Sequence, residues 1–289
     1  MGARNGSEQS PEQASAVAIL GSAFDFDSAG AAGLRFEPQD IATERGVQRV
    51  HYVRGLSRPA AVIFRHGQPH TVLPNQINYR ALALALRELG CRSLLVSSSV
   101  GVMDGKLPLF RPLLLDDILM PDNRLPDGSA CTLFDEPTPG QGHLVLEEGL
   151  FSRALTEQLA QICAARSLPV TRDVIFAYVG GPRTKTRAEN RYWAAAGAQV
   201  NSMTLAPEVV LAAELEIPCV GFCVGHKYSA GARPARDDHA PPVDLSESLV
   251  LSRGAQERII FDFLEQATPV APGNRIYRFA DERAASQRA

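Results

Sequence analysis

The sequence predicts an α/β fold, with a mixed β-sheet flanked by helices. Short apolar runs that end in turn residues alternate with longer segments of helical periodicity. The apolar runs are continuous, which is typical of strands buried on both faces of a sheet. A length of 289 residues allows one large domain or two small ones. No internal repeat is present to suggest a solenoid.

The composition favours a globular protein without a nucleic-acid or membrane partner. Hydrophobic residues make up 45%, charged residues 21%, and the formal net charge is −3. No dense basic stripe is present that would bind phosphate backbones. No apolar run approaches the roughly 20 residues that span a bilayer, and the polar N-terminus lacks signal-peptide features. We therefore expect a soluble, cytoplasmic protein.

The five cysteines are odd in number and mostly lie in apolar runs. Cys219 and Cys223 are four residues apart in a predicted strand, on the same face. No second ligand pair has zinc-like spacing. Reduced, buried thiols are therefore favoured over a metal site.

The first half of the chain contains three predicted strands and one helix. The strands cover residues 16–20, 60–64 and 94–96. The helix covers residues 77–89, because its leucines recur on one face and Gly90 supplies a C-terminal stop. Residues 104–143 are rich in proline and glycine, which predicts long loops with short strands at the edge of a site.

The second half alternates helices and strands in the same way. Helices are expected at residues 151–165, 186–196 and 207–215, strands at 174–179 and 219–224, and a last helix from Asp244 with Glu247 in a capping box. Residues 1–14 predict a disordered N-terminus, residues 230–242 a mobile loop, and residues 280–289 a flexible tail.

Polar side chains follow four of the predicted strands, which indicates one shared site. These residues are Ser22, Arg65-His66, Ser98-Ser99 and His226-Lys227. Ligands of open α/β sheets bind at the carboxyl ends of the strands. A serine in a glycine turn and an arginine beside a histidine are both suited to phosphate. A surface arginine and a core histidine are the alternative for the second pair.

One long motif resembles a known enzyme family. Residues 180–189 (GGPRTKTRAE), followed by 202–204 (SMT) and 207–212 (PEVVLA), resemble the core signature of the trimeric purine nucleoside phosphorylases, in the methylthioadenosine phosphorylase branch. Upstream, Arg65-His66-Gly67, His70-Thr71, Pro74 and Asn78-Tyr79 match in the same order. The resemblance covers roughly residues 15–265.

The resemblance implies a phosphorylase-type three-layer fold with a twisted mixed β-sheet, in a single domain over residues 15–279. It also implies a homotrimer, inorganic phosphate as co-substrate, no other cofactor and no metal. By the same resemblance, phosphate would be bound by Ser22, Arg65, His66, Ser98 and Thr204. The substrate would contact Ser99, Met203 at the ribose, and His70 and Tyr79 near the sugar and its 5′ end. By spacing alone Met203 would be a core residue, and Tyr79 is equally suited to packing at a helix start.

The match fails where the family binds its purine. Lys227-Tyr228-Ser229 stands where the adenine branch has an Asp-Tyr-Asp segment, and Lys185 stands where the 6-oxopurine branch has a glutamate. Thr184 replaces an aromatic residue. Lys227 and His226 therefore become the candidate catalytic groups, and Thr184, Lys185 and Ser229 the candidate base contacts. Side chains that point to solvent are the alternative for the two lysines.

These residues predict a phosphorylase-like glycosyltransferase that cleaves the N-glycosidic bond of a nucleoside-like substrate with a non-standard base. Three alternatives remain: an ordinary methylthioadenosine or purine nucleoside phosphorylase, a repurposed enzyme of specialised metabolism that does not perform phosphorolysis, and a non-catalytic binding protein.

Overall fold

The computed structural model describes residues 11–21, 24, 33–137, 141–229 and 245–278, without the side chains of residues 245–249. Predictions for Ser22, for the loop at 230–242, for the capping box of the last helix and for the tail at 280–289 lie outside these residues. Most of the predicted disordered N-terminus does so as well. Residues 11–14 are described, and the Ala14 amide donates to the Leu89 carbonyl oxygen at 2.7 Å. Specific contacts therefore begin slightly before the predicted start of the domain.

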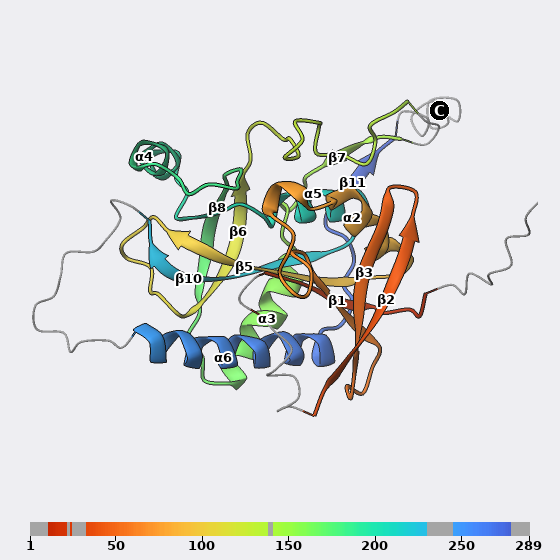
Figure 1. Cartoon of the computed structure of the whole chain (residues 1–289), viewed down its shortest axis with the longest axis horizontal. Coiled ribbons are helices and arrows are strands. Elements are labelled where there is room, and N and C mark those ends of the chain that lie inside the picture. Colours follow the sequence, from red (N-terminus) through yellow and green to blue (C-terminus); the bar gives the residue numbers. More distant parts are fainter. Residues whose placement is uncertain (1–10, 22–23, 25–32, 138–140, 230–244, 279–289) are drawn as a thin grey trace, which may run out of the picture.

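Within these described residues, nine strands form one mixed sheet (Figure 1). In sheet order they are β10 (Cys219–Tyr228), β6 (Pro112–Leu119), β8 (Thr171–Tyr178), β9 (Val200–Ser202), β5 (Ser93–Val102), β1 (Ala16–Leu20), β4 (Ala60–Phe64), β3 (Gly46–Arg54) and β2 (Arg35–Thr43). Strand β10 also pairs with β5, so β5, β9, β8, β6 and β10 close into a ring. Strands β1, β4, β3 and β2 extend the sheet from β5. A small second sheet joins β7 (His143–Val145) and β11 (Arg275–Tyr277).

Helices cover both faces of this sheet, as Figure 1 shows. The helices are α2 (Tyr79–Glu88), α3 (Arg153–Ala165), α4 (Arg187–Ala195), α5 (Ala206–Glu214) and α6 (Leu245–Gln266), with a short 3-10 helix η1 (Pro74–Gln76). Helices α2 and α5 pack in one hydrophobic cluster, and α3 and α6 pack in the other.

Strand β1 shows how the sequence builds the two layers. Val17 and Ile19 lie in the cluster with α2 and α5, whereas Ala16, Ala18 and Leu20 lie in the cluster with α3 and α6. Successive side chains of a strand point to opposite faces, so a continuous apolar run serves both layers. The predicted three-layer α/β fold is thus confirmed.

The structure differs from the predicted elements in several places, and strands β9 and β11 are among the elements that were not predicted. The hairpin of β2 and β3 was not predicted, because its outer strand is mostly exposed and polar and therefore lacks an apolar run. Strands β5 and β10 also extend several residues beyond their predicted ends, through Ser97–Val102 and Gly225–Tyr228. Those extensions are polar or glycine-containing, and they carry the candidate site.

Candidate active site

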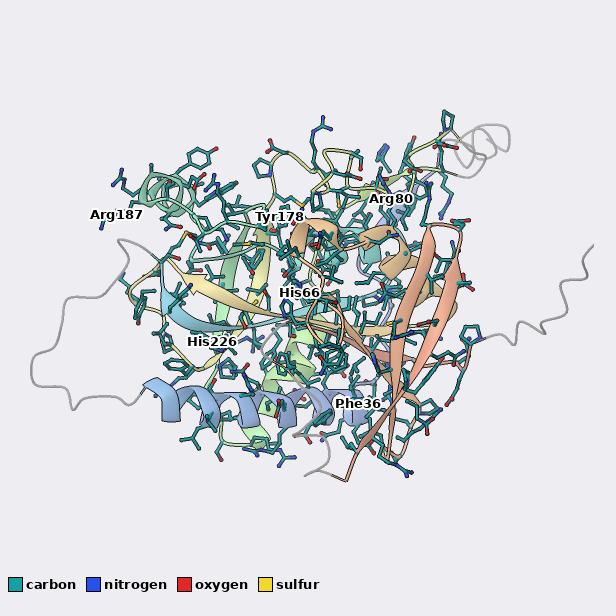
Figure 2. All side chains as sticks on the ribbon, viewed as in Figure 1. Phe36, His66, Arg80, Tyr178, Arg187 and His226 are labelled. Atoms are coloured by element: carbon teal, nitrogen blue, oxygen red, sulfur yellow. The ribbon has the colours of Figure 1, made fainter. Side chains whose placement is uncertain are left out.

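A cavity of about 780 Å³ opens where the carboxyl ends of β1, β5 and β10 meet. Most of the predicted site residues line it. They are His66, His70, Ser98, Ser99, Thr184, Lys185, Met203, Thr204, His226, Lys227 and Ser229. Figure 2 shows His66 near the middle of the molecule and His226 toward the end of β10. Residues more than 150 positions apart in the sequence are therefore brought to one cavity.

Two predicted residues do not line the cavity. Arg65 is fully buried behind its wall, and Tyr79 is 2% exposed at the start of α2. The Tyr79 hydroxyl donates to the carbonyl oxygen of Pro74, which itself lines the cavity. Both side chains thus support the site from behind.

The Arg65 guanidinium has protein partners for its nitrogens. Nε forms an ion pair with Glu208 Oε1 at 2.9 Å, and both side chains are 0% exposed. One terminal nitrogen, Nη2, donates to the carbonyl oxygens of Ser97 and Ile19 at 2.7 and 3.2 Å. Burial raises the pKa of Glu208, and the Arg65 charge opposes that rise. Because a guanidinium does not lose its proton in proteins, the carboxylate form of Glu208 leaves the buried pair without net charge.

The other terminal nitrogen of Arg65 sets the direction of a hydroxyl. Arg65 Nη1 donates to Thr204 Oγ1 at 2.9 Å. Since the threonine oxygen accepts this bond, its own proton remains available to donate elsewhere. Thr204 lines the cavity, so the hydroxyl can donate to an anion bound there.

His66 presents a hydrogen-bond acceptor. Its Nδ1 lies 2.9 Å from the carbonyl oxygen of Val72, and a carbonyl only accepts, so Nδ1 carries a proton. Burial lowers the pKa of His66 to about 4, which keeps the ring neutral at pH 7 and leaves Nε2 unprotonated. His66 also stacks on His70, with ring centroids 4.5 Å apart. His66 therefore accepts a hydrogen bond from a ligand hydroxyl or a protonated phosphate oxygen.

Ser98 and Met203 complete this end of the cavity. Ser98 Oγ donates to Ser202 Oγ at 3.1 Å, which joins β5 to β9. A Cβ atom added to Gly181 would lie 2.6 Å from the Met203 sulfur. The turn after β8 passes directly over Met203, so a larger residue at position 181 would force the Met203 side chain to shift.

The opposite end of the cavity is built on a β-bulge. Gly225 pairs with Val100 and Lys227 pairs with Gly101, so His226 is the extra residue of β10. Bulges redirect side chains, and they are frequent beside active sites. Here the bulge places both His226 and Lys227 on the cavity wall. Burial lowers the pKa of His226.

Other residues that line the cavity were not among the predicted site residues. Asn201 donates to Asn190 Oδ1 at 3.3 Å and to Ser229 Oγ at 3.4 Å, and Arg253 of α6 also lines the cavity. Ser202 belongs to the SMT motif at residues 202–204, but it was not predicted to line the site. Asn190 and Asn201 are buried, and an isolated asparagine in an amphipathic segment gives no sequence signal. Glu208 had a signal, a charged residue in the apolar helix 207–215, which is unusual unless the charge is paired.

Lys185 is half-buried in the cavity wall, close enough to Lys227 for their charges to interact. Burial, followed by the Lys227 charge, lowers the pKa of Lys185 to about 8. We expect ¹³C-dimethylation of the lysines, read by NMR, to give a Lys185 resonance that titrates near pH 8. The chain has three lysines, Lys106, Lys185 and Lys227, so single variants assign each signal. In the Lys227→Met variant the pKa of Lys185 should rise. An unshifted value in the native protein would contradict the buried position of this side chain.

Within the residues that the structure describes, no group of three or more metal-ligating side chains occurs, and no helix is long and apolar enough to cross a membrane. The five cysteines are buried. Cys219 and Cys223 lie in the same core cluster.

Comparison with known proteins identifies the family. Residues 17–264 match the family model described as "Phosphorylase superfamily". The chain is 32% identical over 220 residues to a probable S-methyl-5′-thioinosine phosphorylase of Methanopyrus kandleri, covering 75% of this chain and 81% of that protein. It is 31% identical over 234 residues to a probable 6-oxopurine nucleoside phosphorylase of Thermococcus kodakarensis, covering 79% and 85%.

The fold is also found among solved structures. A methylthioadenosine phosphorylase from Schistosoma mansoni in complex with adenine superposes with a TM-score of 0.71 at 22% identity, covering 86% of this chain and 90% of that one. An identity this low supports the shared fold alone. The family match covers most of the described chain, including the strands and turns that build the cavity. The chain therefore belongs to the phosphorylase superfamily.

Proposed function

We propose that the protein is a pentosyltransferase that cleaves a nucleoside-like substrate with inorganic phosphate. The observation that carries this proposal is that the hydroxyls of Ser98 and Thr204 and the acceptor of His66 meet in one cavity with Met203. Phosphate bound there attacks C1′ of the pentose as the bond to the base breaks. The new C1′–O bond yields the pentose 1-phosphate, and the base leaves with the electron pair of the broken bond.

The residues divide this reaction between two ends of the cavity. The sugar gains positive charge in the transition state, and an anion held beside it stabilises that charge. Ser98, Thr204 and His66 orient phosphate, while Arg65 orients Thr204. At the other end the departing base needs a proton. Lys185, with a pKa of about 8, is suited to donate it, because an efficient general acid has a pKa near the working pH. His226 is the less suited donor of the two, since burial lowers its pKa and so reduces the fraction that carries a proton. Lys227 supplies a positive charge beside the base.

The base is proposed to be other than adenine or hypoxanthine. No carboxylate is found among the described residues that line the cavity, whereas the resemblance assigns base recognition to acids at positions now occupied by Lys185 and Lys227. An active site that lacks the partners of a substrate's polar groups discriminates strongly against that substrate. Ordinary purine or methylthionucleoside phosphorolysis is the second candidate, because the relatives are named for those activities.

Phosphate dependence tests the reaction. A panel of nucleosides is incubated with and without phosphate, and release of base and pentose 1-phosphate is followed by mass spectrometry. We expect turnover only with phosphate, and adenosine, inosine and methylthioadenosine at least 100-fold below the ordinary enzymatic efficiency of about 10⁴ M⁻¹s⁻¹. The Ser98→Ala variant should lose activity, while the exposed-site variant Lys106→Met should retain it. Methylthioadenosine cleavage at ordinary efficiency would favour the second candidate, and phosphate-independent turnover would contradict phosphorolysis.

A homotrimeric assembly is part of this proposal by family resemblance, and a cytoplasmic location is part of it by composition. Light scattering at micromolar concentration measures the first, and a monomer would contradict it.

A further inference from the structure

Two of the three lysines of the chain line the same cavity. Lys185 comes from the turn before α4 and Lys227 from the bulged end of β10, whereas the third, Lys106, does not line the cavity. Arginine supplies nearly all other positive charge in this chain. Neither cavity lysine has an ion-pair or hydrogen-bond partner within the described part of the chain. Lysine is a compact cation that shifts its pKa when it is buried.

Two like charges beside one cavity destabilise each other. The effect is visible in Lys185, whose pKa falls because of burial and because of the Lys227 charge. Lys227 is exposed and can extend into water, but Lys185 is half-buried and cannot move away in the same way. No carboxylate is found among the described lining residues. The Glu189 carboxylate acts on Lys185 from outside the cavity and offsets the Lys227 charge only in part. A bound anion would offset the remainder.

The phosphate co-substrate does not account for this charge. Strand β5 carries both ends of the cavity, with Ser98 at the phosphate end and Gly101, the pairing partner of Lys227, at the other. Three residues of a strand span about 10 Å. The backbone beside Lys227 therefore lies about that far from the phosphate end, and we infer from this separation that the lysine pair faces the base.

We propose that the leaving group is an anionic heterocycle, bearing a carboxylate or a ring oxyanion, which Lys185 and Lys227 bind together. This proposal rests on the proposed function, since it names the substrate class of the same site. It explains both substitutions at once, because carboxylates at these positions would repel such a base. It also explains why two lysines line the cavity, because donation of a proton to the base would require only one of them.

Matched pairs of ribosides that differ by one negative charge test the proposal. Nicotinate riboside and nicotinamide riboside differ only at the substituent, and neither needs a proton to release its base, so charge recognition is separated from acid catalysis. Xanthosine and inosine form the second pair, with the charge on the ring, because xanthosine ionises near neutral pH. Affinities are measured by isothermal titration calorimetry in saturating sulfate, which keeps the anions out of the phosphate end and does not take part in phosphorolysis.

We expect the anionic member of at least one pair to bind tenfold or more tightly than its neutral partner. The double variant Lys185→Met, Lys227→Met should bring the ratio of the two affinities below about twofold, whereas Lys106→Met should leave it unchanged. The parent protein and both variants should bind phosphate equally. The preference should also decline between pH 7 and pH 9.5, as Lys185 loses its proton. Equal affinities within both pairs, or a preference that survives in the double variant, would overturn the proposal.

These outcomes are separable from failure of the proposed function. Charge preference without any phosphate-dependent cleavage would retain the anion site and reject phosphorolysis. Phosphate-dependent cleavage of neutral nucleosides without charge preference would retain phosphorolysis and reject the anion site.

Discussion

Replacing Glu208 with alanine is expected to lower the free energy of unfolding by about 3–5 kcal/mol, because the Arg65 guanidinium would remain as a buried charge without a counter-charge. Both side chains are fully buried, and their ion pair measures 2.9 Å. Urea denaturation measures the change as a lower midpoint with an unchanged slope. The exposed pair Arg49–Asp40 supplies a matched control, since Asp40→Ala should cost about 1 kcal/mol or less.

A double variant separates the stability of this pair from its role in the site. Arg65→Met combined with Glu208→Leu removes both charges, and such replacements are often tolerated. We expect it to recover part of the stability lost in Glu208→Ala. The phosphate affinity of the double variant should be lower than that of the parent protein, because Thr204 would no longer receive the hydrogen bond from Arg65. A Glu208→Ala protein as stable as the parent would contradict the buried ion pair.

The second large effect is expected at Thr204. Thr204→Val removes the hydroxyl that lines the cavity and leaves one Arg65 donor without its partner. A hydrogen bond to a charged group contributes about 1.5–3 kcal/mol, so the Kd for phosphate should rise by roughly 10- to 100-fold. Calorimetric titration with inorganic phosphate measures this without knowledge of the nucleoside.

Thr204→Ser is the matched control for that experiment. It keeps the hydroxyl and removes only a methyl group, so phosphate affinity should stay within about threefold of the parent. Weak phosphate binding in both variants would mean that Thr204 acts through packing rather than through its hydroxyl. Unchanged binding in Thr204→Val would remove Thr204 from the phosphate end.

The sequence was sufficient to predict which residues lie near one another, and insufficient to predict the directions of their side chains. His66, Ser98 and Lys227 follow strands whose carboxyl ends share one edge, so strand order and family resemblance together place them in one cavity. Arg65 follows a strand in the same way, yet its side chain turns into the core. Its direction is decided by Glu208, 143 positions away in the sequence, and a local pattern contains no information about such a pairing. The same holds for Asn190 and Asn201, which meet only once β9 and α4 are packed.

The closed ring of strands also limits how this protein selects substrates. Ser98 and Gly101 lie on one strand, β5, which pairs with β9 at Gly101 and with β10 along its length. The distance between the two ends of the cavity is therefore fixed, because they cannot separate without breaking a ladder of backbone hydrogen bonds. Selection by length then needs no lid or hinge. New specificity would arise by exchange of the side chains at the base end, as the lysines in place of acids illustrate. The phosphate end would stay in the same position.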